Sequence, residues 1–73
     1  MPRLPRVTAA QVVRVLEKAG FVFARQTKHR IYRDAAGRRV ALPYYAVKII
    51  RPRTLKSILR DAGLTVEEFI RLL

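Results

Sequence analysis

The sequence predicts a single α+β domain that spans residues 1–73, with a three-stranded antiparallel sheet and helices on one of its faces. Three observations predict this class. Apolar residues recur at helical spacing near both ends of the chain, they alternate with a period of two in the middle, and turn residues separate the segments. The expected order is α-β-β-β-α with a short final helix, and the other face of the sheet is expected to be open to solvent.

The first helix is predicted over about residues 8–19. Thr8 is followed three residues later by Gln11, which is the pattern of a capping box at a helix start. Gly20 then marks the end of the helix. The apolar face between these signals consists of Val12, Val13, Leu16 and Ala19.

Three short strands are predicted next, at about residues 21–26, 29–34 and 38–43. Phe21 and Phe23 are expected in the core. The connection from Asp34 to Gly37 has turn residues where a short hairpin loop uses them, so the second and third strands should pair antiparallel. Pro43 ends the third strand because it has no N–H for the ladder.

Residues 44–52 show no clear period and are predicted to form a loop. A second helix follows over about residues 53–62, with Gly63 as its C-terminal stop. Thr65 and Glu68 form another capping-box pattern, which starts the short final helix. Phe69 belongs to its apolar stripe and is expected in the core, and all the apolar stripes are expected to cover the sheet.

The charge of the chain predicts a polyanionic partner. Sixteen Lys and Arg residues against five acidic ones give a formal net charge of +11, far more than solubility requires. Nucleic acid is the leading partner, and a membrane surface is disfavoured because no long apolar run or basic amphipathic helix with an aromatic face is present. The absence of cysteine excludes disulfides and thiolate sites, and the first residues lack the apolar core of a secretory signal, so a cytoplasmic protein is expected.

The only histidine, His29, lies in the most basic stretch of the chain, residues 25–33. Metal-free RNA cleavage needs a group that takes the 2′-hydroxyl proton or protonates the leaving 5′-oxygen, and cations that stabilise the charge developing on phosphorus. Histidine titrates near neutral pH, whereas Arg25, Lys28 and Arg30 stay charged, so together they suit this chemistry. On the residues alone, the favoured interpretation of His29 is a partly exposed strand histidine that hydrogen-bonds a backbone group.

Strict alternation along the second strand would place His29 on the same face as Ile31, which is expected to be the core side. Other kinds of active site find little support. One histidine and five scattered carboxylates cannot easily provide three convergent metal ligands. A Ser-His-Asp arrangement would need Ser57, the only serine, which lies in the middle of the second predicted helix. We therefore expect no metal and no cofactor.

Basic residues outside the helices predict a surface that follows an RNA backbone. Cations on helices are usually solvated, but a larger group clusters on the predicted strands, their turns and the loop before the second helix. Tyrosines among them could stack on bases or pack half-buried with the hydroxyl in water. The residues expected to contact RNA are Arg25, Lys28, Arg30, Tyr32, Arg38, Arg39, Lys48 and Arg51.

Short motifs along the whole chain match those of one known family. Gly20-Phe21 follows the first helix, Arg25-Gln26 precedes the basic turn, and His29-Arg30-Ile31-Tyr32 follows it. Residues 37–43 read Gly-Arg-Arg-Val-Ala-Leu-Pro, and the most specific match is the tail, at residues 52–69. In these motifs the sequence resembles the HicA family of small bacterial and archaeal toxins, formerly grouped as YcfA-like proteins.

The resemblance implies a fold like that of double-stranded-RNA-binding domains, a metal-independent endoribonuclease that cleaves messenger RNA, and a HicB-like antitoxin that blocks it. It also implies that His29, which aligns with the catalytic histidine of the family, acts as general acid or base. The family usually has Gly-Ser or Gly-Gly just before this histidine, where Thr27-Lys28 stand here. Two alternatives therefore stay open: an RNA-binding module of the same fold that does not cleave, and a domain that serves mainly to bind an acidic protein partner.

Overall fold

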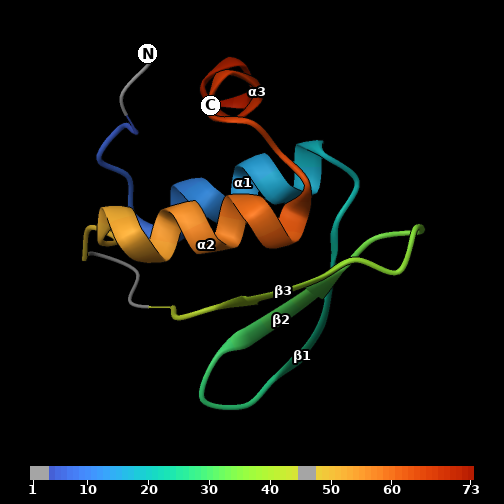
Figure 1. Ribbon diagram of the computed structural model, residues 1–73. Coiled ribbons are helices and arrows are strands. Elements are labelled where there is room, and N and C mark those ends of the chain that lie inside the picture. Colours follow the sequence, from blue (N-terminus) through green and yellow to red (C-terminus); the bar gives the residue numbers. More distant parts are fainter. Residues whose placement is uncertain (1–3, 45–47) are drawn as a thin grey trace.

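Six elements follow one another along the chain in the predicted α-β-β-β-α-α order (Figure 1). The computed structural model describes residues 4–44 and 48–73. Every predicted helix and strand is present, and the α+β class is confirmed. The elements are α1 (Ala9–Lys18), β1 (Val22–Gln26), β2 (Arg30–Arg33), β3 (Arg39–Leu42), α2 (Pro52–Ala62) and α3 (Val66–Leu72).

The ends of the helices lie where the sequence signals them. The Thr8 side chain accepts from the backbone N–H of Gln11, and the Gln11 side chain accepts from the Thr8 backbone N–H at 2.8 Å. Thr65 and Glu68 form the same reciprocal pair at the start of α3. Helix α2 ends at Gly63, whose φ of 70° is a conformation that only glycine adopts without strain.

The sheet has the order β1-β2-β3, and both pairs of strands are antiparallel. The β2–β3 register is regular, and the turn between these strands closes through a hydrogen bond from the Asp34 N–H to the Arg38 carbonyl, with Gly37 at a φ of 85°. The β1–β2 register shifts between Phe23 and Arg25, so Ala24 is the extra residue of a bulge. The predicted hairpins are therefore present, with one irregularity that the alternation did not signal.

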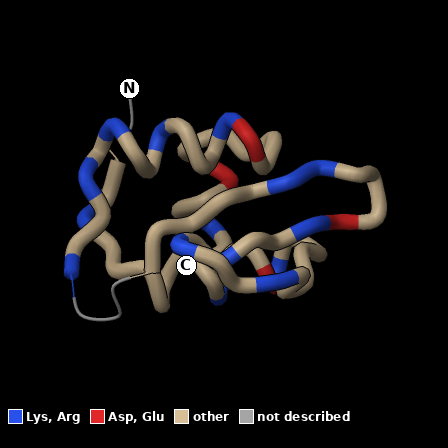
Figure 2. The backbone as a smooth tube through the Cα atoms, turned by 90° about the horizontal axis from the view of Figure 1, so that it is seen from below, with Lys and Arg blue, Asp and Glu red and all other residues tan. Residues whose placement is uncertain are grey.

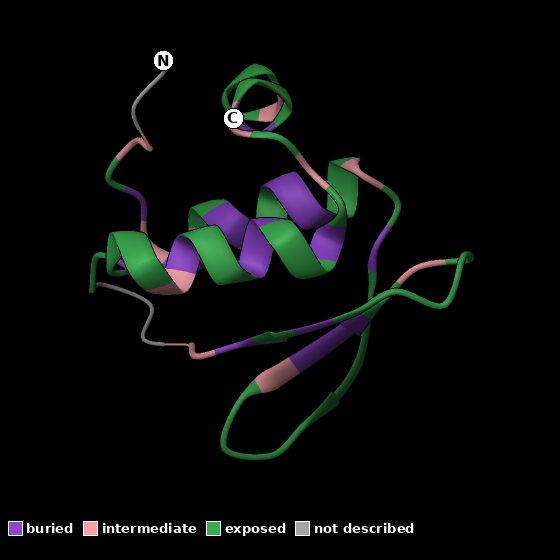
Figure 3. Cartoon of the chain, viewed as in Figure 1, coloured by how far each residue is buried: buried purple, intermediate pink, exposed green. Residues whose placement is uncertain are grey.

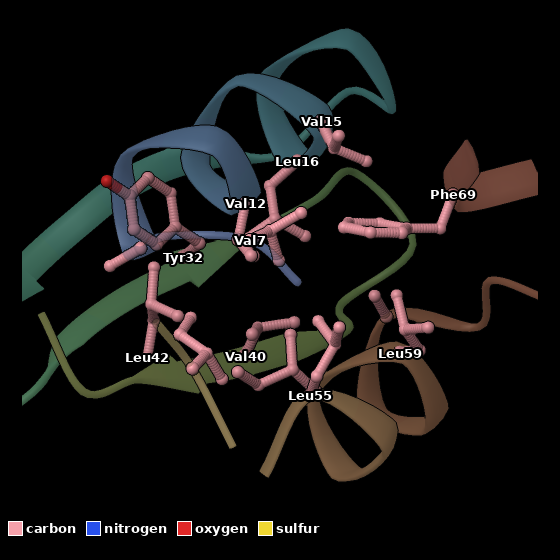
Figure 4. Packing of buried hydrophobic residues seen from close by; sticks show 14 of the residues in the cluster. Val7, Val12, Val15, Leu16, Tyr32, Val40, Leu42, Leu55, Leu59 and Phe69 are labelled. Carbon is pink, nitrogen blue, oxygen red and sulfur yellow. The ribbon is translucent and has the colours of Figure 1, made fainter. Parts of the chain in front are cut away.

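Helices α1 and α2 lie over one face of the sheet, as predicted, but α3 lies on the far side of them (Figure 1). The side chain of Phe69 carries the packing of α3, because it is fully buried and points in towards α1 and α2 (Figure 4). The Lys18 ammonium also donates to the Leu72 carbonyl at 3.1 Å. The expectation that every apolar stripe covers the sheet is therefore wrong for α3. Its apolar side packs on the other helices instead of on the sheet.

The segments before α1 and α2 pair with each other. The Ile50 N–H donates to the Val7 carbonyl at 2.8 Å, and Thr8 and Ile49 form an isolated antiparallel bridge. Part of the predicted loop is therefore held in place by backbone pairing. This pairing brings the starts of the two long helices together. Tyr45 is one of the tyrosines expected to stack on bases or to pack half-buried, and it lies outside the described residues.

Two buried-residue expectations need correction at the sheet. Phe21 is 2% exposed, but Phe23 is 53% exposed, since β1 is an edge strand that is exposed along its length (Figure 3). Ile31 is buried, yet it pairs with exposed Ala41 and alternates with core Tyr32, so it faces the open side of the sheet. Neighbouring side chains on that side must therefore cover it.

Candidate nucleic-acid interface

His29 is exposed in the loop that joins β1 to β2. Gln26 and Arg30 pair at the base of this loop, and the Thr27 N–H donates to the His29 carbonyl at 2.9 Å. The strand predicted at 29–34 therefore starts one residue later, and the loop takes His29 out of the strand alternation that would have turned it to the Ile31 side. Within the described part of the chain, its ring makes no hydrogen bond, in contrast to the alternative of a ring bonded to the backbone.

The backbone of this loop does not require glycine. In residues 4–44 and 48–73, positive φ values occur only at Gly20, Gly37 and Gly63. Thr27 and Lys28 thus adopt conformations that any L-residue can reach, and the loop forms with side chains where the HicA pattern has Gly-Ser or Gly-Gly.

Lys48 and Arg51 lie at the same end of the sheet as His29. Arg30, which follows the loop, pairs with Leu42 at the end of β3. Just beyond it is a pocket of about 430 Å³, lined by Pro43, Lys48, Ile49, Ile50, Arg51 and Thr54. Arg51 is the N-cap of α2 without a side-chain cap bond, and the first turn of α2 has no acidic residue, so the positive end of the helix dipole adds to these cations.

Arginines dominate the open face of the sheet. The register places Arg25 opposite Ile31, and Arg33 directly opposite Arg39. Like charges in opposing positions repel each other. Figure 2, which views the molecule from the side of the sheet, shows many basic positions on strands, loops and helices and few acidic ones between them. This face therefore has a strong tendency to bind anions.

Arg30 points to the helix side of the sheet instead. Its guanidinium lies 3.8 Å from the ring centre of Tyr44 and 6.0 Å from that of Phe23, so two aromatic rings hold it. Its Nε is buried without a hydrogen-bond partner. A second pocket, of about 420 Å³, adjoins it and is lined by Val13, Glu17, Phe23, Gln26, Arg30 and Tyr32.

Two residues expected to contact RNA lie elsewhere. Tyr32 is 2% exposed, which leaves no ring surface for a base, so its role is in the core. Arg38 lies at the opposite end of the sheet from His29, where it forms an ion pair of 3.6 Å with Asp34 and packs its guanidinium beside Gly63. Sequence spacing shows neither burial nor which end of a strand a residue occupies. The burial of Tyr32 disfavours base stacking, whereas contact of the exposed Arg38 with RNA stays a prediction.

Two pocket residues, Glu17 and Phe23, were not among the expected site residues. Glu17 carried no signal, since an acidic residue on the wet side of a helix is ordinary. Phe23 could have been found only by recognising β1 as an outer strand. Among the residues described, no group of three or more His, Asp or Glu side chains is placed to hold a metal ion. None of the helices seen in these residues is long and apolar enough to cross a bilayer.

The chain matches a model of a known protein family. A family model described as the HicA toxin of bacterial toxin-antitoxin systems matches residues 9–64. This range contains the His29 loop, the arginines of the open face and both pockets. No curated protein is similar enough to the chain to be compared with it.

Proposed function

The chain belongs to the HicA toxin family of bacterial toxin–antitoxin systems, and from this premise we propose that it is a metal-independent endoribonuclease that cleaves messenger RNA. The observation that carries the proposal is the position of His29. The only imidazole in the chain is exposed on a loop, at the end of the sheet where cations of the loop itself and of the segment before α2 gather.

In the proposed reaction, the 2′-oxygen attacks the neighbouring phosphorus and the bond to the 5′-oxygen breaks, which leaves a 2′,3′-cyclic phosphate and a free 5′-hydroxyl. His29 takes the 2′-hydroxyl proton or protonates the leaving oxygen, and water exchanges the other proton. Lys28 is adjacent on the loop, and its charge would stabilise the negative charge that develops on the phosphate oxygens.

Phosphates on either side of the reacting one would bind the remaining cations. We propose Arg25 and Arg39 on the open face, and Lys48 and Arg51 beside the start of α2. Arg33 joins this group because it directly opposes Arg39. A phosphate between two like charges removes their repulsion, which favours binding there.

Cleavage of messenger RNA by the purified wild type and by His29→Ala, both in EDTA, tests the assignment. We expect the variant to lose activity by about 10²-fold or more, which is the usual contribution of a general acid or base. His29 is exposed, so the fold should be retained, and circular dichroism checks this. His29→Gln, which keeps a polar side chain of similar reach, should be equally inactive. Equal cleavage by wild type and His29→Ala would show that the catalytic assignment is wrong.

A second candidate is an RNA-binding module that does not cleave. Thr27 and Lys28 favour it, since side chains beside His29 keep a phosphate farther from the loop backbone than glycine would. Salt-dependent RNA binding with no product after long incubation would support this candidate. Restored cleavage by Thr27→Gly with Lys28→Ser would then identify the loop as the cause.

A toxin of this family implies an antitoxin, and we propose an acidic HicB-like protein that covers the basic end of the sheet. The charge of +11 supports an acidic partner, since complementary potentials speed association and select against basic competitors. RNA and the antitoxin would then compete for the same surface. Addition of the antitoxin should release bound RNA from His29→Ala.

A further inference from the structure

The second pocket lies on the helix side of the β1–β2 hairpin, and we call it the hairpin pocket. It is lined by Val13, Glu17, Phe23, Gln26, Arg30 and Tyr32, and its volume is about 420 Å³. Gln26 and Arg30 are the paired residues that close the loop carrying His29. The pocket therefore begins where the catalytic loop ends.

The walls of the hairpin pocket combine an aromatic surface with two opposite charges that do not pair. Phe23 is 53% exposed and meets Tyr32 edge to face, with ring centres 5.8 Å apart, so part of the Phe23 ring faces solvent. Glu17 and Arg30 both line the space, yet they form no ion pair with each other. Within the described residues, the Glu17 carboxylate also makes no hydrogen bond or ion pair, although it is one of five acidic side chains in a chain with sixteen basic ones.

Arg30 is held in place without losing its hydrogen-bonding capacity. The rings of Tyr44 and Phe23 contact its guanidinium, and no hydrogen bond to any described residue uses its N–H groups. The Nε of Arg30 is buried, so this guanidinium, held by the two rings, keeps its Nη groups available for a ligand. The pocket thus offers a fixed donor, an unpaired carboxylate acceptor and a stacking surface.

We propose that the hairpin pocket binds a guanine base of a single-stranded RNA, next to the phosphate that His29 acts on. Guanine presents N–H donors at N1 and N2 that match the Glu17 carboxylate, and acceptors at O6 and N7 that match Arg30. Adenine offers a carboxylate only its 6-amino group, and uracil lacks the paired acceptors that arginine prefers. Phe23 supplies the stacking surface on which single-stranded bases usually rest.

The position of the pocket fits a strand that passes over the hairpin end. Arg25 and Arg33 point to the open face, whereas Glu17 and Arg30 line the helix side. His29 lies on the loop between the two sides. An RNA strand that crosses the loop can place its phosphates against the open-face arginines and turn one base into the hairpin pocket.

Because this inference rests on the proposed ribonuclease function, its test uses binding as well as cleavage. The probes are short oligouridine RNAs with one central G, inosine, A or U, bound to His29→Ala in EDTA and followed by fluorescence anisotropy. We expect the G probe to bind about tenfold more tightly than the A and U probes. Inosine, which lacks the 2-amino group of guanine, should lie between them.

Glu17→Gln in the His29→Ala background should reduce the difference between the G and inosine probes, because the amide offers one neutral acceptor oxygen where the carboxylate offers two charged ones. Phe23→Ala should weaken the binding of all four probes. Glu67→Gln, an exposed acidic position on α3, is the matched control and should leave the preference unchanged. Glu17 is exposed on α1, so the Glu17→Gln variant should fold normally.

Equal binding of the four probes, or a difference between the G and inosine probes that Glu17→Gln leaves unchanged, would overturn the guanine site. Cleavage separates this from the ribonuclease proposal: wild type is expected to cut beside G in preference to inosine, and Glu17→Gln to cut beside the two more nearly alike. A protein that binds G preferentially but cuts no probe would support the pocket and contradict the endoribonuclease. A protein that cuts all probes alike would contradict the pocket and support the endoribonuclease.

Discussion

Phe21 and Phe23 lie two residues apart and look equivalent in the sequence, yet they have opposite environments. Phe21 is 2% exposed beneath the helices, whereas Phe23 is 53% exposed on the outer strand and faces the hairpin pocket. Alternation along a strand assigns both to one face, but it does not say whether a helix covers that face at each position. Burial at single residues therefore depends on how far α1 and α2 extend over the sheet.

This difference makes a prediction for stability. Phe21→Ala should lower the free energy of unfolding by about 3–5 kcal/mol, because it leaves a cavity in the core. Phe23→Ala should lower it by less than about 1 kcal/mol, because about half of this residue is already in water. Urea unfolding followed by circular dichroism measures both. Similar losses of stability for the two variants would contradict the exposure of Phe23, and with it the role of Phe23 as a wall of the hairpin pocket.

At the level of elements, α3 shows how a short helix is stabilised. It has seven residues, too few to be stable alone, and two features hold it: the buried Phe69 and the capping box of Thr65 and Glu68. Hydrogen bonds with Thr65 hold the pKa of Glu68 below its ordinary value. The bond with the Thr65 backbone has the larger effect, and the bond with its side chain the smaller one. The cap therefore stabilises the helix mainly when Glu68 is ionised.

The lowered pKa predicts how the cap responds to acid. Since the folded pKa of Glu68 lies below the unfolded one, its contribution is full above the unfolded pKa and is lost as pH falls through the folded pKa. Glu68→Gln should therefore show a smaller loss of stability than the wild type between neutral and acidic pH in urea unfolding. Glu67→Gln, in the same turn but outside the cap, is the control. An acid response of Glu68→Gln equal to that of the wild type would contradict the capping contribution.

For the molecule as a whole, charge and topology together define the surface on which we propose that RNA binds. Antiparallel pairing brings the His29 loop, the end of β3 and the start of α2 to one end of the sheet, while the Arg38 turn lies at the other (Figure 1). Arg33 and Arg39 then oppose each other on the face that the helices leave uncovered. We therefore expect much of the affinity for RNA to be electrostatic and to fall with salt.

Salt titration tests this orientation. In the His29→Ala background, Arg33→Gln with Arg39→Gln should reduce the slope of log K against log salt concentration by about two, one for each lost phosphate contact. Lys56→Gln with Arg60→Gln, which removes two exposed cations from α2, is the matched control. If the α2 pair changed the slope and the sheet pair did not, RNA would lie on the helix side and the proposed orientation would be wrong.

The sequence by itself determined the α+β class, the number and order of elements, the caps at Thr8, Gly63 and Thr65, and His29 as the one candidate acid–base residue. These properties are local: they follow from hydrophobic period, from capping within a few residues and from composition. The tertiary structure decided the loop position of His29, the burial of Tyr32 and the exposure of Phe23. It also decided the stacking of α3 on other helices. Each of these depends on contacts between segments far apart in the chain, which local pattern does not contain.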